Sequence, residues 1–298
     1  MSFVTSAPDE FFLDPRVVRR AFDRASRSYD AAAGVQSEVG ARLLERLDVV
    51  RLQPEVVLDL GAGTGHASRA LKQRYRRAEV VALDLSTSML RESARQQSWL
   101  RRFGRVAGDA ARLPVRDASV DLVFSNLMLE WCPDPDAVFR EIRRVLRPQG
   151  LLMFTTLGPD TLKELRDAWR PVDQYTHVHR FIDMHDIGDA LMRAGLADPV
   201  MDTEQLTITY PSVRALVSEL KSTGARNLAH GRSRGLTGRR RSTEFLRRSE
   251  ALIRNGRLSV SVEVVYGQAW AGVLSPRKRA GGEVRVPLDS LRTRRREQ

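Results

Sequence analysis

Three glycines and three aspartates lie at or near the ends of short apolar runs in the first half of the chain, where they could contact a ligand. The set comprises Asp59, Gly61, Gly63, Gly65, Asp84 and Asp109. Glycines allow unusual backbone angles and let the main chain approach a ligand closely. Asp84 comes about 20 residues after the glycines, where a carboxylate can accept hydrogen bonds from both hydroxyls of a ribose. Asp109, beside the backbone amide of Ala110, is placed to accept a hydrogen bond from the amino group of an adenine.

These residues must lie at the ends of parallel strands, and the hydrophobic pattern predicts such strands. The apolar run 56–60 ends in the glycines, which is typical of a buried parallel strand followed by a tight turn. Ser86 is a suitable N-cap for a helix that carries Met89 and Leu90. The other predicted strands here are 80–84, 105–109, 121–126 and 151–156, with helices that include 66–75 and 136–146. Strands that alternate with helices of these lengths predict a doubly wound α/β sheet.

Helical and strand patterns continue on both sides of this alternating region. Apolar residues at helical spacing between 15 and 47, with a polar break at 26–30, predict two helices ahead of the main fold. The predicted elements after Pro159 are helices at 160–169 and 183–194 and strands at 205–210 and 258–268. The tail, 273–298, is basic and poor in core residues, so we expect it to be disordered.

The composition favours a soluble, basic protein with an anionic partner. The formal net charge is +12 and the isoelectric point is about 10.7, which suggests a nucleic acid, a membrane surface or an acidic protein as partner. A single cysteine, Cys132, excludes an intramolecular disulfide and argues against a metal site built on cysteines. The N-terminus lacks an apolar run of signal-peptide length, and no later stretch approaches membrane-spanning length. We therefore expect a cytoplasmic protein that uses neither a metal nor a membrane.

The glycine loop and its acids resemble those of class I S-adenosylmethionine-dependent methyltransferases, over about 55–158. A G-x-G pattern alone also fits NAD-binding proteins, but the acids at the strand ends favour the methyltransferases. The resemblance implies a Rossmann-like, doubly wound, mostly parallel seven-stranded sheet with N-terminal helices and a helical lobe on the substrate side. It also implies S-adenosylmethionine as cofactor. The residues implied to bind it are Asp59, Gly61, Ala62, Gly63, Gly65, Asp84, Leu85, Met89, Asp109, Ala110 and Asn126.

More specific motifs resemble the malonyl-[acyl-carrier protein] O-methyltransferases of biotin synthesis, from about residue 17 to 270. These motifs are 22–25 with Tyr29, 125–127, 130–132, 154–162, 179–183, 220–227 and 266–270. The resemblance implies methylation of the free carboxylate of a malonyl thioester, carried by acyl carrier protein or coenzyme A, to give the ester that starts pimeloyl and biotin synthesis. The implied division is an N-terminal helical cover of the active site at 1–50, a cofactor-binding core at 51–158, a substrate and carrier-protein lobe at 159–272 and the tail at 273–298.

Tyr29 and Arg180 are the candidate catalytic residues. A malonyl carboxylate is already ionised at neutral pH, so its methylation needs alignment and exclusion of water but no general base. No catalytic His–Asp pair is evident in the sequence, and His177 and His179 are interpreted as orienting or structural. Arg180 could grip the carboxylate through a bidentate contact, and Tyr29 could close over the donor methyl group. A surface arginine and a packing tyrosine would give the same pattern.

Two other functions fit parts of the sequence. The same core could methylate a small aromatic or lipid acceptor of the quinone type. The basic stretch 226–257 fits the docking of an acidic carrier protein, but it would also suit a nucleic acid. Stacking on bases needs interleaved aromatic residues, and Phe245 is the only aromatic residue between 221 and 257, which counts against a nucleic acid.

Overall fold

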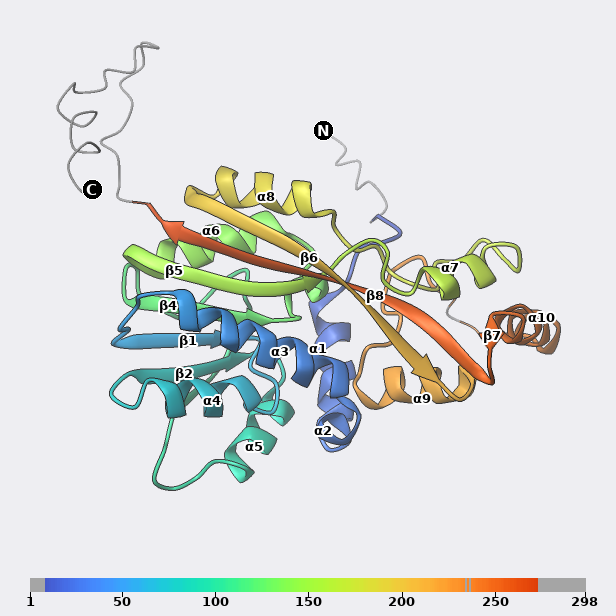
Figure 1. Cartoon of the computed structure of the whole chain (residues 1–298), viewed down its shortest axis with the longest axis horizontal. Helices are drawn as coiled ribbons and strands as arrows, with labels where there is room; N and C mark the ends of the chain where they lie inside the picture. Colours follow the sequence, from blue (N-terminus) through green and yellow to red (C-terminus); the bar gives the residue numbers. More distant parts are fainter. Residues whose placement is uncertain (1–8, 234, 236, 273–298) are drawn as a thin grey trace, which may run out of the picture.

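The structure, a computed structural model, describes residues 9–233, 235 and 237–272 (Figure 1). The predicted disordered tail, 273–298, lies outside the described residues. Within the described part, no helix combines the length and the apolar character that crossing a bilayer requires.

One mixed sheet runs through the described chain (Figure 1). Its strands are β1 Val56–Leu60, β2 Glu79–Asp84, β3 Gly104–Ala107, β4 Val120–Asn126, β5 Leu146–Leu157, β6 Leu196–Tyr210, β7 Ile253–Arg254 and β8 Arg257–Ala271. The order is β3-β2-β1-β4-β5-β8-β6, in which the first five strands are parallel and β8 runs antiparallel to both of its neighbours. The predicted doubly wound, mostly parallel sheet is confirmed. A two-residue strand, β7, pairs with β8 in addition to the seven strands predicted.

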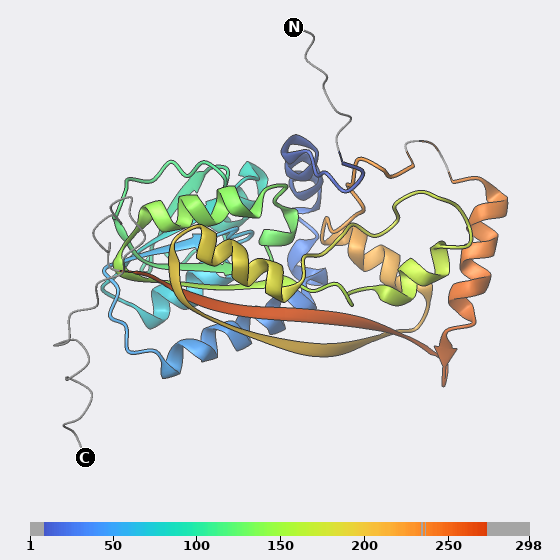
Figure 2. The same cartoon turned by 90° about the horizontal axis from the view of Figure 1, so that it is seen from above.

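Helices cover both faces of the sheet (Figure 2). They are α1 Pro15–Ala25, α2 Tyr29–Ala32, α3 Gly34–Arg46, α4 His66–Arg74, α5 Thr87–Arg95, α6 Pro135–Val145, α7 Lys163–Trp169, α8 Met184–Arg193, α9 Val213–Ser222 and α10 Arg239–Glu250, with short 3-10 turns at Leu47–Val49 and Leu129–Trp131. Phe139 of α6 and Leu191 of α8 belong to one buried cluster. Leu43 of α3 and Leu71 of α4 belong to a second cluster on the other face. Burial on both faces explains why the central strands are nearly continuous apolar runs.

Capping side chains fix the helix starts close to the strand ends. Ser86 Oγ accepts a hydrogen bond from the amide of Met89 at 3.1 Å, so the predicted N-cap of α5 is confirmed. Asp14 and Asp134 cap α1 and α6, each directly before a proline at the start of the helix. A cap of this kind stabilises a helix by about 1 kcal/mol. The helix starts, and the turns that precede them, are therefore well defined by local sequence.

The structure differs from the sequence prediction mainly after residue 195. β6 begins at Leu196, whereas the prediction began at Gln205. β6 is an edge strand, and its pairing with β8 shifts register between Ala197 and Val200, which accommodates Pro199. The helices α9 and α10 were not predicted, because arginines obscure the apolar face of α10. The N-terminal region contains a third, one-turn helix, α2, where two helices were expected.

The outer halves of β6 and β8 extend past the parallel strands and carry α7, α9 and α10 (Figures 1 and 2). We call this part of the molecule the lobe. Leu165 of α7, Leu216 of α9 and Phe245 of α10 form a buried cluster with Leu258 and Val260 of β8. Because β8 belongs to both the sheet and this cluster, the lobe is built on a continuous strand and not on a separate linker.

Gly267 of β8 offers a test of this packing. It pairs with Phe154 and Met201, and a Cβ at Gly267 would lie 2.3 Å from Phe154 Cζ and 2.9 Å from Met201 Sδ. Gly267→Ala should therefore lower the free energy of unfolding by about 1–3 kcal/mol in urea denaturation. Gly188→Ala in α8 is the control, and it should be neutral or stabilising because no atom lies within 4 Å of its Cβ position. Wild-type stability in Gly267→Ala would contradict the packing described.

Candidate active site

The glycine loop after β1 is held against the end of β2. The amides of Gly61 and Ala62 donate hydrogen bonds to the carbonyl oxygen of Leu83 at 2.8 and 3.0 Å. Gly61 has a φ of 77°, and a Cβ there would lie 2.3 Å from Met128 Cγ, so a larger residue would not fit. Gly63 has no atom within 4 Å of its Cβ position. The backbone of the loop therefore borders open space that a ligand can fill.

The carboxylate of Asp84 binds the loop from the end of β2. Its Oδ2 accepts a hydrogen bond from the amide of Gly63 at 2.8 Å, and its Oδ1 accepts one from the amide of Ser86 at 2.7 Å. Burial raises the pKa of Asp84 to about 6, and the two amides oppose this shift. The group is therefore mainly ionised at neutral pH. Each carboxylate oxygen keeps a lone pair for a further donor.

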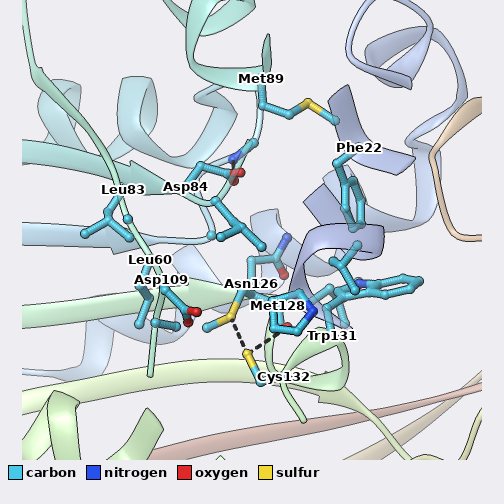
Figure 3. Close-up of a pocket in the computed structure, with 18 of the residues that line it drawn as sticks. Phe22, Leu60, Leu83, Asp84, Met89, Asp109, Asn126, Met128, Trp131 and Cys132 are labelled. Carbon is cyan, nitrogen blue, oxygen red and sulfur yellow. Dashed lines mark hydrogen bonds between the residues drawn. The ribbon is translucent and has the colours of Figure 1, made fainter. Parts of the chain in front are cut away.

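Asp84 and Asp109 lie on the same side of a cavity at the strand ends, and Phe22 and Trp131 lie on the opposite side (Figure 3). We call it the strand-end cavity. Asp109 is exposed, and its Oδ1 accepts a hydrogen bond from the amide of Ala111 at 2.9 Å. Most of the predicted cofactor-binding residues line this cavity, namely Gly61, Gly63, Asp84, Leu85, Met89, Asp109, Ala110 and Asn126.

A second hollow, the glycine-loop cavity, is lined by Asp59 and Ala62 and shares Gly61 and Gly63 with the strand-end cavity. Asp59 is buried, and its Oδ2 accepts a hydrogen bond from the hydroxyl of the helical residue Ser68. Burial raises the pKa of Asp59 to about 7. The two cavities together surround the loop residues on which the cofactor prediction depends.

Gly65 lines neither of these cavities, although it was predicted to bind the cofactor. Its φ is 79°, and a Cβ there would lie 2.3 Å from Ser93 Oγ and 3.2 Å from Phe103 Cζ. The glycine therefore allows the start of α4 to pack closely against α5. This geometry favours a packing role for Gly65 over the predicted contact with the cofactor.

A third hollow, the lobe cavity, extends from the strand ends into the lobe. Apolar side chains such as Leu165, Leu216 and Val260 form much of its wall. It shares Tyr29 and Trp131 with the strand-end cavity. Tyr29 also lines the glycine-loop cavity. The three hollows are thus adjacent at Tyr29, which lines each of them.

Hydrogen bonds to aspartates of the N-terminal helices hold the segment around Tyr29 against the core. Ser86 Oγ donates to Asp23 Oδ1 of α1 at 2.6 Å, and Thr64 Oγ1 donates to Asp30 Oδ1 of α2 at 2.6 Å. Burial, together with nearby carboxylates, raises the pKa of Tyr29 well above its usual range. The phenol therefore stays protonated and can donate a hydrogen bond, but it does not act as a base at neutral pH.

Glu130 is a half-buried residue of the lobe cavity that was not predicted to belong to the site. The hydroxyl of Thr156 donates to its Oε2 at 3.2 Å. Burial raises the pKa of Glu130 to about 8, so the group is mainly protonated at neutral pH and can donate a hydrogen bond. Its place beside Trp131 in one of the motifs was a signal, but the motif alone does not reveal which way the side chain points.

His179 is buried at the wall of the lobe cavity and is neutral. Its ring packs against the rings of Trp131 and Phe181, with centroid distances of 4.9 and 5.1 Å. Burial lowers the pKa of His179 to about 4. An aromatic environment of this kind fits the structural role that the sequence suggested.

His177 forms a pair with Asp173 that was not evident in the sequence. The distance between His177 Nε2 and Asp173 Oδ1 is 2.7 Å. The imidazole stacks on Trp169 with a centroid distance of 3.6 Å, and Arg241 Nη1 of α10 lies 3.4 Å from Asp173 Oδ2. These contacts tie the loop after α7 to α10. They favour a role for the pair in positioning the lobe.

Arg180 does not line the lobe cavity, although His179 and Phe181 on either side of it do. Its side chain is exposed and lines a separate hollow, which also contains Glu130. Arg226, in the segment after α9, does line the lobe cavity. The geometry therefore favours Arg226 over Arg180 for a contact with an anionic ligand. Sequence reasoning missed Arg226 because it was grouped with the other arginines of 226–257.

Comparisons with known proteins agree with this geometry. Residues 58–154 match the family model described as a methyltransferase domain. The chain is 52% identical to malonyl-[acyl-carrier protein] O-methyltransferase of Methylovorus sp., over 88% of this chain and 90% of the relative. It is 48% identical to the protein of the same name from Halorhodospira halophila, over 95% and 97%. The YcgJ protein of Bacillus subtilis shares the fold, with a TM-score of 0.57 at 18% identity over 79% of this chain and 99% of that protein. The chain therefore belongs to the malonyl-[acyl-carrier protein] O-methyltransferase family.

Proposed function

We propose that the protein transfers a methyl group from S-adenosylmethionine to the free carboxylate of malonyl-acyl carrier protein. The observation that carries the proposal is the junction of the strand-end and lobe cavities at Phe22, Tyr29 and Trp131. A donor in the first cavity and an acceptor in the second would meet at this junction. Membership of the family supports the identity of the acceptor. The resulting methyl ester would start pimeloyl and biotin synthesis.

The residues around the glycine loop fit S-adenosylmethionine, which when bound supplies an electrophilic methyl group on a positively charged sulfur. Asp84 would accept hydrogen bonds from the ribose hydroxyls, and Asp109 would accept one from the adenine amino group. The open space beside Gly63 allows the ligand to lie against the backbone. Asp59, in the glycine-loop cavity, would pair with the ammonium group at the amino-acid end of the cofactor, which would stabilise its ionised form.

The acceptor side requires orientation more than acid–base chemistry. A malonyl carboxylate is ionised at neutral pH, so no proton has to be removed before it attacks the methyl carbon. The guanidinium of Arg226 and the protonated hydroxyl of Tyr29 would orient the carboxylate through charge-assisted hydrogen bonds. One oxygen has to stay free of these donors to act as the nucleophile. The apolar walls of the lobe cavity exclude water, which strengthens these contacts.

The direct test is to incubate the wild-type protein with S-adenosylmethionine and malonyl-acyl carrier protein and to analyse the carrier protein by mass spectrometry. We expect a methyl ester on the malonyl group. An unmodified malonyl group, together with methyl transfer to a quinone precursor, would contradict the proposal and favour the alternative acceptor class.

Asp84→Asn should weaken S-adenosylmethionine binding by about tenfold or more in calorimetry, since it removes a charged acceptor of hydrogen bonds. Wild-type affinity should also fall as the pH drops through about 6, where Asp84 becomes protonated, and the variant should show less of this dependence. Asp186→Asn, an exposed carboxylate on α8, is the control and should bind like the wild type. Unchanged affinity in Asp84→Asn would remove the ribose assignment.

Arg226→Ala should lower kcat/KM for malonyl-acyl carrier protein by about tenfold or more and leave S-adenosylmethionine affinity intact, because it removes a charge-assisted contact to the acceptor. Arg180→Ala tests the assignment made from the sequence, and we expect a smaller loss because its exposed side chain lies outside the lobe cavity. Steady-state kinetics of both variants decide between the two arginines. A larger loss in Arg180→Ala would return the carboxylate contact to that residue.

The kcat/KM for the malonyl substrate should fall as the pH rises above about 8. Glu130 is protonated and able to donate below its pKa of about 8, and above it the ionised group would repel the malonyl carboxylate. Glu130→Gln keeps a hydrogen-bond donor that does not ionise in this pH range. The pH–rate profile of this variant should therefore lack the alkaline decline. The measurement is a pH–rate profile of both proteins, and an identical decline in the variant would exclude Glu130 as its source.

A further inference from the structure

A basic groove lies between α1 and the segment 221–232 at the end of α9. Its volume is about 640 Å³. The charged side chains that line it are Arg20, Arg24, Lys221, Arg226 and Arg232, and no aspartate or glutamate lines it. The groove therefore concentrates positive charge in a concave surface.

The arginines of α1 that face the groove differ from their neighbour on the same helix. Arg20 and Arg24 are four residues apart, so they lie on one face and repel each other. Arg19, which does not line the groove, lies 3.9 Å from Asp23. Within the described residues, none of the five groove cations forms an ion pair with a carboxylate. Their charge remains available to an external anion.

The two walls of the groove are joined by close packing. Gly224 has a φ of 79°, and a Cβ there would lie 3.2 Å from both Ala25 and Phe22 of α1. The hydroxyl of Ser28 donates to the carbonyl oxygen of Ser222 at 2.9 Å. The groove is therefore a defined feature of the fold, in which side chains from distant parts of the sequence are brought together.

The basic groove adjoins the lobe cavity. Arg226 and Asn227 line both of them. The Asn227 side-chain amide donates to the carbonyl oxygen of Thr176, which fixes its orientation. A ligand with an anionic group in the groove and a slender extension past these two residues would reach the proposed methylation site.

We propose that Arg20, Arg24, Lys221 and Arg232 of the basic groove bind the phosphodiester of the 4′-phosphopantetheine arm of the carrier protein. The arm then passes Asn227, and the malonyl carboxylate meets Arg226 on the side of the lobe cavity. This inference rests on the proposed function. A phosphodiester attracts several guanidinium groups, and the uncharged arm suits a largely apolar cavity. The lining of the groove contains no aromatic ring, so a nucleic acid would find no surface for base stacking.

This placement differs from the docking surface suggested by the sequence, which comprised 226–257. Two arginines of α10 within that stretch, Arg247 and Arg248, pair with Glu244 at 2.7 Å. Their charge is therefore partly neutralised on the helix itself. The groove instead combines the first part of 226–257 with α1, a helix that the charge pattern alone did not connect with carrier-protein binding.

The test compares substrates with and without the phosphate. Arg20→Ala/Arg24→Ala should lower kcat/KM for malonyl-acyl carrier protein by about tenfold or more, because it removes charge-assisted contacts. With malonyl-pantetheine, which lacks the phosphate, the double variant should match the wild type within about twofold. Arg16→Ala, which removes one positive charge from α1 outside the groove, is the control and should leave both activities unchanged. Added salt should reduce wild-type activity on the carrier protein more than that of the double variant.

Equal losses with both substrates would overturn the proposal, because they would show damage to the lobe cavity and not loss of a phosphate contact. Undiminished activity of the double variant on the carrier protein would also overturn it. A higher wild-type kcat/KM for malonyl-coenzyme A than for the carrier-protein thioester would assign the groove to coenzyme A instead.

Binding provides a readout that does not depend on methyl transfer. Carrier protein that bears the arm without a malonyl group should bind the wild type about tenfold more tightly than the double variant. If no malonyl thioester were methylated by the wild type, the proposed function would fail, and this binding difference would still decide the role of the groove. Equal binding of the arm-bearing carrier protein by the two proteins would overturn it.

Discussion

The half-buried carboxylate of Asp84 connects parts of the fold that would otherwise be independent. It accepts the amide of Gly63 from the glycine loop and the amide of Ser86 at the start of α5. Ser86 in turn donates its hydroxyl to Asp23 of α1. Burial of an ionised group is costly unless hydrogen bonds compensate for the lost water. The two amides provide this compensation, so the loop, the strand end and the covering helices adopt one mutual arrangement around a single charge.

Much of the fold could be predicted from the sequence because its central strands are buried on both faces. Their apolar runs, together with caps such as Ser86, are local signals that need no tertiary information. β6 was predicted too short because its first residues include Pro199, and a proline fits into a strand only at a sheet edge or a bulge. The sequence does not reveal which strand lies at the edge. The helix α10 was missed because only one side of an arginine-rich segment, at Phe245 and Ser249, is buried.

The candidate site likewise contains residues that could be predicted from the sequence and residues that could not. Residues at the strand ends, such as Asp84 and Asp109, were predictable because parallel strands bring their carboxyl ends to one edge. Glu130 and Arg226 were not, because their facing the lobe cavity depends on how distant segments pack. Arg180 shows the reverse case. It lies in sequence between two residues that line the lobe cavity, yet its own side chain lies outside that cavity. A sequence motif shows which residues are neighbours in the chain but not which way each side chain points.

The helix α1 lines two hollows at once. Val18 and Phe22 line the strand-end cavity, while Arg20 and Arg24 line the basic groove. A short helix moves as a rigid unit, so a displacement that widens one surface also changes the other. Thermodynamic linkage then requires that any effect of the donor on carrier-protein affinity be matched by an equal effect of the carrier protein on donor affinity. With both ligands bound as proposed, one amphipathic helix would couple the occupancy of the strand-end cavity to that of the basic groove.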